Sequence, residues 1–198
     1  MPPLRTSIQP LPFAIAVTLI LAASCKNPST LFEDIPPSHS GISFNNLIVE
    51  NDSVNQLDNG NVYNGGGVAI ADFNNDSLPD IYFTGNLVPN KLYINLGALK
   101  FSDVTEASGT NGQGKWCRGA AVADINNDGW NDIYVSATIS GSAERRRNIL
   151  YINKGCSDDG IPVFADMAAE YGLDDDSHTT QASFFDYDND GDLDVYLV

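Results

Sequence analysis

The stretch that decides the fold is Ala120-Ala-Val-Ala-Asp-Ile-Asn-Asn-Asp-Gly-Trp-Asn-Asp-Ile-Tyr134. It begins with small and β-branched residues, passes through a loop rich in Asp and Asn, and leaves through an Ile-Tyr pair. This pattern is typical of two short strands joined by a turn. Because the same pattern recurs around Asp72 and around Asp186, the sequence predicts several copies of one structural unit.

Two further elements repeat after the first two loops. One is the tetrapeptide Leu-Tyr-Ile-Asn, ending at Asn95 and at Asn153, and the other begins at Phe101 and at Phe164. Four short strands in each unit make a β-propeller blade. The second unit is longer than the first, and its extra residues fall in two turn-rich segments, Gly141–Arg147 and Cys156–Pro162. We therefore predict an all-β chain whose residues 41–198 form an incomplete propeller fragment of about two and a half blades.

Each Asp/Asn loop presents oxygen-bearing side chains at its positions 1, 3, 5 and 9, and position 7 would add a backbone carbonyl. The candidate ligands are Asp72, Asn74, Asp76, Leu78 and Asp80 in the first loop, Asp124, Asn126, Asp128, Trp130 and Asp132 in the second, and Asp186, Asp188, Asp190, Asp192 and Asp194 in the third. Six or so hard oxygens suit Ca²⁺, whereas zinc or copper would require His or Cys. The cofactor that this pattern predicts is Ca²⁺.

Position 6 of each loop needs a positive φ to turn the chain around an ion. Gly129 and Gly191 supply it, but Ser77 does not, so the first site is expected to be strained. The alternative reading of one such loop is an Asx turn without metal. Three copies argue against it, because carboxylates about 4 Å apart repel by roughly 4 kcal/mol per pair at an effective dielectric of 20.

The segments Gly65-Gly-Gly-Val-Ala-Ile-Ala-Asp-Phe-Asn74 and Phe184-Phe-Asp-Tyr-Asp-Asn-Asp-Gly-Asp192 resemble the FG-GAP/VCBS repeat family. The resemblance covers roughly residues 41–198 and is greatest to exported bacterial proteins that often carry an ASPIC/UnbV domain. It implies an integrin-α-like propeller of seven-bladed type, with calcium in the hairpin between the first two strands of a blade and a role in adhesion or ligand binding. Ser77 departs from the family's glycine.

The first residues predict export. Residues 1–24 resemble a signal peptide, with Arg5 in a basic start and an apolar run from Leu11 to Ala23. The sequence Ala22-Ala-Ser-Cys25 resembles the lipobox of bacterial lipoproteins, which predicts a lipid on Cys25, although an ordinary secretory signal remains the alternative. Residues 25–40 are expected to form a tether. The predicted location is the bacterial outer membrane or cell surface, with membrane contact only through the lipid.

The remaining signals concern chemistry outside the loops. Cys117 and Cys156 are left open between a disulfide and free thiols. Trp116 is interpreted as filling space between blades, as a tryptophan beside a strand usually does. The two histidines, His39 and His178, have no Ser or Cys partner in a recognisable catalytic motif.

The net charge of −16, from 26 acidic against 10 basic residues, excludes nucleic acid as a partner, because its phosphates would be repelled. We therefore interpret the chain as a non-enzymatic surface module in which calcium is structural and the ligand is an extracellular protein or polysaccharide. The alternative is a calcium-requiring polysaccharide-degrading enzyme on a propeller scaffold. Such an enzyme would need a cleft with His, Lys, Tyr or Arg positioned for chemistry.

Overall fold

The computed structural model describes residues 31–198. The predicted signal peptide, the predicted lipidation site Cys25 and the first part of the predicted tether lie outside the described residues. The chain divides into two units, Met1–Ile35 and Pro36–Val198, and every strand found in residues 31–198 belongs to the second. That unit begins with the short helix α2 (Pro37–Ser40), where His39 Nε2 lies 3.1 Å from the carbonyl oxygen of Ala98.

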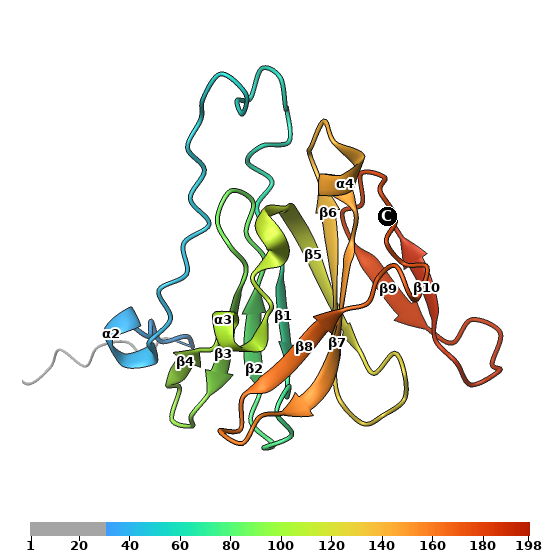
Figure 1. Ribbon diagram of the computed structural model, residues 1–198. Helices are drawn as coiled ribbons and strands as arrows, with labels where there is room; N and C mark the ends of the chain where they lie inside the picture. The colour runs from blue at the N-terminus through green and yellow to red at the C-terminus, as the bar shows by residue number, and fades with distance from the viewer. Residues whose placement is uncertain (1–30) are drawn as a thin grey trace, which may run out of the picture. The chain divides into compact units, whose positions relative to one another are not determined.

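The second unit contains two four-stranded antiparallel sheets followed by a strand pair (Figure 1). The first sheet has the order β1 (Val68–Ala71), β2 (Asp80–Phe83), β3 (Lys91–Asn95) and β4 (Phe101–Asp103). The second has the order β5 (Trp116–Ala123), β6 (Asp132–Thr138), β7 (Ile149–Cys156) and β8 (Pro162–Asp166), and the pair is β9 (Ala182–Phe185) with β10 (Asp194–Leu197). Within each sheet, every strand pairs with the next one along the chain, which confirms the predicted all-β fold of propeller blades.

The connections between strands are short. They carry one turn of helix at α3 (Thr105–Ser108), at the 3₁₀ segment η1 (Gly112–Gly114) and at α4 (Ala143–Arg146). The two segments predicted to hold the extra residues of the second unit do so: α4 lies between β6 and β7, and residues 157–161 turn between β7 and β8. Within residues 31–198, no helix has the length and apolar character needed to cross a membrane.

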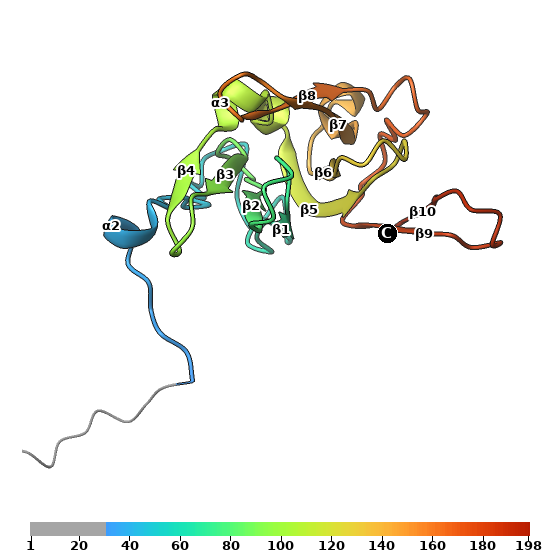
Figure 2. The same cartoon turned by 90° about the horizontal axis from the view of Figure 1, so that it is seen from below.

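The blades pack against one another through their faces. The first strands of successive units are neighbours, β1 beside β5 and β5 beside β9, and Figure 2 shows this from below. Between the first two blades the core contains Tyr82, Leu92, Ile133 and Tyr151. Every residue of β6 is buried, because this strand has a blade on each side, and each fully buried aliphatic side chain contributes roughly 1.5 to 3 kcal/mol.

The three Asp/Asn loops are equivalent hairpin connections. Each loop connects two residues that stand opposite each other in the ladder of the first two strands. These flanking pairs are Ala71–Asp80, Ala123–Asp132 and Phe185–Asp194. Because the register is the same each time, loops 72–79, 124–131 and 186–193 begin and end at corresponding places. The repeated sequence is therefore a repeated structure, and these segments are called the hairpin loops below.

Each hairpin loop contains two residues with positive φ. The prediction for position 6 is confirmed, with φ of 70° at Ser77, 87° at Gly129 and 94° at Gly191. Position 4 also has positive φ in all three loops, a feature that the sequence analysis missed. Its residues are Asn75 (58°), Asn127 (55°) and Asn189 (62°). Asparagine tolerates this conformation better than most residues, so its recurrence at position 4 was the available signal.

The asparagine that ends each Leu-Tyr-Ile-Asn segment closes the hairpin. Asn95 Nδ2 donates to the carbonyl oxygen of Pro79 at 2.9 Å, within its own blade. Asn153 Nδ2 instead donates to two carbonyl oxygens, that of Asn131 in its own blade (3.2 Å) and that of Phe73 in the preceding blade (2.9 Å). Asn153 therefore joins two blades, whereas Asn95 does not.

We expect Asn153→Ala to destabilise the fold more than Asn95→Ala, by roughly 1 to 3 kcal/mol, because it also leaves the buried Phe73 carbonyl without a donor. Urea unfolding of the two variants beside the wild type measures the difference. Both substitutions remove the same side chain at equivalent positions, so each controls for the other. Equal losses of unfolding free energy would contradict the bridging role.

We expect Ser77→Gly to stabilise the protein, because relief of about 1 to 2 kcal/mol of left-handed backbone strain exceeds the extra entropy cost of glycine, about 0.5 to 1 kcal/mol. Gly129→Ser should have the opposite effect at the equivalent position. Ser102→Gly is the matched control, since Ser102 lies in strand β4, and there the change should only destabilise. Thermal melting monitored by circular dichroism gives the sign in each case.

Candidate metal centre

The first aspartate of each hairpin loop holds the backbone of the turn. Asp72 accepts hydrogen bonds from the amides of Asp76 (3.1 Å) and Ser77 (2.7 Å). In the second loop Asp124 accepts from Asp128 (2.9 Å) and Gly129 (2.8 Å). Asp186 likewise accepts from Gly191 at 3.2 Å. These bonds curl the chain around the side chains at positions 1, 3 and 5.

The last aspartate of each loop connects the turn to the sheet. One oxygen of Asp80 accepts from the amide of Phe73 (2.9 Å) and the other from the amide of Asn95 on β3 (2.8 Å). The equivalent Asp132 accepts from Ile125 (2.9 Å) and Asn153 (2.8 Å). A buried carboxylate that accepts two such backbone hydrogen bonds fixes the hairpin loop, the second strand and the third strand of its blade relative to one another.

The two buried carboxyls, Asp80 and Asp132, have raised pKa values because burial disfavours their charged form. Burial raises the pKa of Asp80 to about 6; the amides of Asn95 and Phe73 lower it, and the nearby charges of Asp76 and Asp72 raise it further. Burial also raises the pKa of Asp132, with Asp128 and Asp124 adding to the effect. Negative charge is therefore concentrated at both loops, and a bound cation would lower these pKa values.

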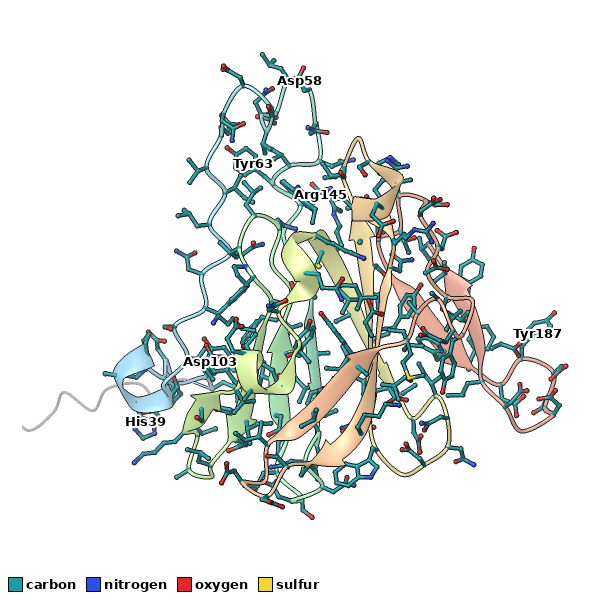
Figure 3. The ribbon with its side chains drawn as sticks, in the orientation of Figure 1. His39, Asp58, Tyr63, Asp103, Arg145 and Tyr187 are labelled. Carbon is teal, nitrogen blue, oxygen red and sulfur yellow. The ribbon has the colours of Figure 1, made fainter. Side chains whose placement is uncertain are left out.

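The third loop brings three carboxylates together. Asp186, Asp188 and Asp194 each offer an oxygen, and these oxygens lie within 4.8 Å of one another. Two oxygens on opposite sides of one Ca²⁺ are about 4.6 to 5.2 Å apart, because each Ca–O distance is about 2.3 to 2.6 Å. One calcium ion can therefore contact all three. The neighbouring Tyr187 is exposed at this loop (Figure 3).

In the first two loops, the asparagine side chain at position 3 is hydrogen-bonded to the aspartate at position 5. Asn74 Nδ2 donates to Asp76 at 3.0 Å, and Asn126 Nδ2 donates to Asp128 at 2.8 Å. These amides would have to present their oxygen to bind a metal, which a rotation of the amide group allows. Asp190 does not belong to the group of three in its loop, where it accepts from the amide of Asp192 at 3.1 Å. The donor set is nevertheless all oxygen and fits Ca²⁺.

The backbone amide at position 7 donates to the aspartate at position 5 in all three loops. The amide of Leu78 donates to Asp76 (2.8 Å) and that of Trp130 donates to Asp128 (2.9 Å), so both residues belong to the loop network. The indole ring of Trp130 also packs over Gly155. The carbonyl oxygens of Leu78, Trp130 and Asp192 remain predicted ligands.

The first two hairpin loops also bind each other, which sequence reasoning missed. Asn131 Nδ2 donates to the carbonyl oxygen of Asp72 at 2.8 Å, and Asn75 Nδ2 donates to that of Gly129 at 3.3 Å. Both bonds join a residue of one candidate site to a residue of the other. No sequence signal reports which asparagines reach across blades, because that depends on how closely the two sheets approach.

Cys117 and Cys156 are both free thiols. Cys117 is buried in the core between the first two blades, and Cys156 is exposed, with its sulfur 3.6 Å from the carbonyl oxygen of Asn74. Trp116 is buried, in agreement with its interpretation as a space-filling residue.

Comparison with known proteins relates this geometry to other chains. The family model described as "FG-GAP-like repeat" matches residues 72–135, the segment that contains the first two hairpin loops. Cartilage acidic protein 1 of Xenopus tropicalis is 32% identical over 139 residues, which cover 69% of this chain and 20% of that protein. Integrin alpha-8 of Mus musculus is 30% identical over 105 residues, which cover 45% of this chain and 10% of that protein.

The chain thus spans a fifth or less of the length of these relatives. The human cartilage acidic protein 1 is 29% identical over 136 residues, which cover 67% of this chain and 20% of that protein. The segment that the family model matches contains the first two hairpin loops, whose register, backbone conformation and carboxylate bonds repeat. On these grounds the chain belongs to the FG-GAP repeat family.

Proposed function

We propose that this chain is an exported calcium-binding propeller module that binds an extracellular protein or polysaccharide, and that its calcium is structural. The observation that carries the proposal is the approach of the Asp186, Asp188 and Asp194 oxygens to one another, in a loop whose register repeats twice more. The relatives support an adhesion-type role, since integrin alpha-8 and cartilage acidic protein 1 do not bear the names of enzymes.

Calcium would be held by the side chains at positions 1, 3, 5 and 9 of each hairpin loop. Its charge would offset the repulsion among carboxylates and fix the turn between the first two strands of a blade. Asp80 and Asp132 would transmit this rigidity to the third strand through the amides of Asn95 and Asn153. Carboxylates saturated by a metal and by backbone amides are poor general acids, which favours a structural role over a catalytic one.

Export fits this chemistry. Extracellular modules bind calcium with dissociation constants of about 10⁻⁴ to 10⁻³ M, so millimolar calcium outside the cell would fill such sites. We propose that a signal peptide directs the chain out of a bacterial cell and that a lipid on Cys25 holds it at the outer membrane or cell surface. With a net charge of −16, the chain should bind neither nucleic acid nor, apart from its lipid, an anionic membrane.

We expect EGTA to lower the melting temperature, because a site held at about 100 times its dissociation constant stabilises the folded state by roughly 2.7 kcal/mol. Equilibrium dialysis with radioactive calcium should show that Asp188→Ala removes one bound ion. Asp158→Ala is the control, since Asp158 is an exposed aspartate outside the hairpin loops. A melting curve that ignores EGTA, or an unchanged stoichiometry in Asp188→Ala, would overturn structural calcium.

The first site should bind calcium more weakly in acid. Because the pKa of Asp80 is raised to about 6, the folded calcium-free protein holds this proton more tightly than the unfolded chain does. The contribution of Asp80 to the stability of the calcium-free protein is thus fully present below about pH 4 and is lost as the pH rises through 6. Calcium must displace the proton, so its affinity at this site should fall about tenfold between pH 7 and pH 5.

Calcium titrations at the two pH values test this expectation, with the site followed through the Asn95 amide signal in nuclear magnetic resonance spectra. The shift of that signal should saturate at a higher calcium concentration at pH 5. Asp80→Asn, which cannot ionise, should flatten the pH dependence of stability measured in EGTA. Equal affinities at pH 5 and pH 7 would show that the proton and the ion do not compete at Asp80.

A further inference from the structure

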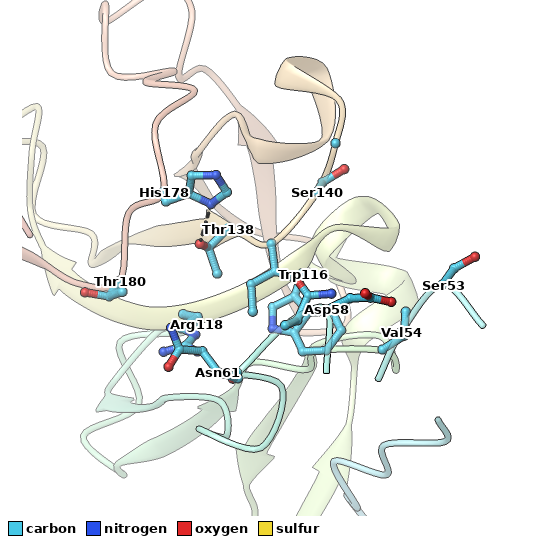
Figure 4. A pocket seen from close by; sticks show the side chains of 14 residues that line it. Ser53, Val54, Asp58, Asn61, Trp116, Arg118, Thr138, Ser140, His178 and Thr180 are labelled. Carbon is cyan, nitrogen blue, oxygen red and sulfur yellow. Dashed lines mark hydrogen bonds between the residues drawn. The ribbon is translucent and has the colours of Figure 1, made fainter. Parts of the chain in front are cut away.

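A cavity of about 640 Å³ lies at the ends of the strands opposite the hairpin loops (Figure 4). Trp116 and Thr138, which face each other at one end of the β5–β6 ladder, both line it, whereas the hairpin loop leaves the other end at Ala123 and Asp132. The remaining walls come from the loop 53–61, the segment 139–141 after β6 and the residues before β9. None of the candidate calcium ligands lines this cavity.

Arg118 is a half-buried cation in the wall of this cavity. It is one of only 10 basic residues in a chain with 26 acidic ones, yet no carboxylate within residues 31–198 forms a salt bridge with it. Its Nη2 donates to the carbonyl oxygen of Asn61 at 3.0 Å, and its Nε has no partner among the described residues. Burial lowers the pKa of Arg118, which reflects the cost of removing its charge from water where no described carboxylate forms a salt bridge with it.

Trp116 adds a second unsatisfied donor. Its side chain is only 6% exposed, and its indole Nε1 is buried without an acceptor in the described part of the chain. Leaving a buried donor unpaired costs roughly 1 to 3 kcal/mol, so such groups are rare unless a ligand satisfies them. Trp116 and Arg118 stand two positions apart on β5, beside the irregularity in its pairing with β6, and both line the cavity.

The rest of the lining is rich in hydroxyl and amide groups. Its uncharged polar members include Ser53, Asn59, Asn61, Thr138, Ser140 and Thr180. One carboxylate, that of Asp58, also lines the cavity and accepts a hydrogen bond from Asn55 Nδ2 at 2.8 Å. His178 is oriented by Thr138, whose Oγ1 lies 3.2 Å from the imidazole Nδ1, as the dashed line in Figure 4 marks. Such a lining suits a ligand that carries many hydroxyl groups, and Arg118 adds a requirement for negative charge.

We propose that this cavity binds an acidic saccharide, with the sugar carboxylate against Arg118. Trp116 forms the wall beside the same end of the sugar, and the hydroxyl and amide side chains bind the ring hydroxyls. The volume of about 640 Å³ lies within the usual range for small-ligand sites, which is about 300 to 1,000 Å³. This inference rests on the proposed role as a binding module, but it uses residues at the other end of the blades.

The test uses the full chain in millimolar calcium with two sugars that differ in one group. Cellobiouronic acid carries a carboxylate where cellobiose carries a hydroxymethyl group. Titration followed by nuclear magnetic resonance should show the indole N–H signal of Trp116 moving with the acid. We expect cellobiose to bind at least tenfold more weakly, since a charge-assisted hydrogen bond contributes roughly 1.5 to 3 kcal/mol.

Two variants keep the test specific. Arg118→Gln should weaken binding of cellobiouronic acid at least tenfold. Arg145→Gln is the control and should leave binding unchanged, because it removes the same charge from the exposed helix α4 (Figure 3). Trp116→Phe changes the wall of the cavity and should weaken binding severalfold, and the loss of buried indole surface should also lower the melting temperature. Binding is therefore compared well below both melting temperatures, where a merely structural role for Trp116 would leave it unchanged.

Several outcomes would overturn the proposal. They are equal binding of both sugars, unchanged binding by Arg118→Gln, tighter binding of hexa-aspartate peptide than of the acidic sugar, or no binding of either sugar. Failure of the proposed calcium role can be told apart from failure of this inference. It would appear as a melting temperature that EGTA does not change, independently of whether either sugar binds. If calcium stabilises the protein and the acidic sugar does not bind, only the acidic-saccharide assignment is wrong.

Discussion

The architecture of the first two blades depends on a buried carboxylate at the end of each hairpin loop. Asp80 and Asp132 are fully buried, and each accepts one amide from its own loop and one from the third strand of its blade. Two charge-assisted hydrogen bonds offset the cost of removing the carboxylate from water only in part, as the raised pKa values of both residues indicate. The turn, the second strand and the third strand are therefore held by one side chain that is itself costly to bury.

Much of this fold could be predicted from the sequence, because a repeated pattern reports structure more reliably than any single stretch does. The recurrence around Asp72, Asp124 and Asp186 identified the hairpins, and the change in spacing located the two lengthened turns. Positive φ at Ser77 followed from its place in the repeat even though serine rarely adopts that conformation. Each of these inferences depended on comparing one unit with another.

The features that escaped prediction depend on distances between units. Asn95 and Asn153 end the same tetrapeptide, yet only Asn153 reaches the neighbouring blade. The difference arises because the second blade has a preceding hairpin loop within reach, which the asparagine's own sequence context does not report. The unpaired donors of Trp116 and Arg118 were equally hidden, since a sequence shows which residues carry donors but not which donors find acceptors.

The lengthened turn between β6 and β7 has a consequence for how such a chain can diversify. Its first residues, Ile139, Ser140 and Gly141, form part of the wall of the cavity, while the hairpin loop at the other end of the same strands keeps the common length. Residues added to this turn alter the cavity without disturbing the carboxylates that hold the blade. Natural variation can thus reshape one end of the blade for a new ligand while the other end preserves the frame, so the two ends can evolve at separate rates.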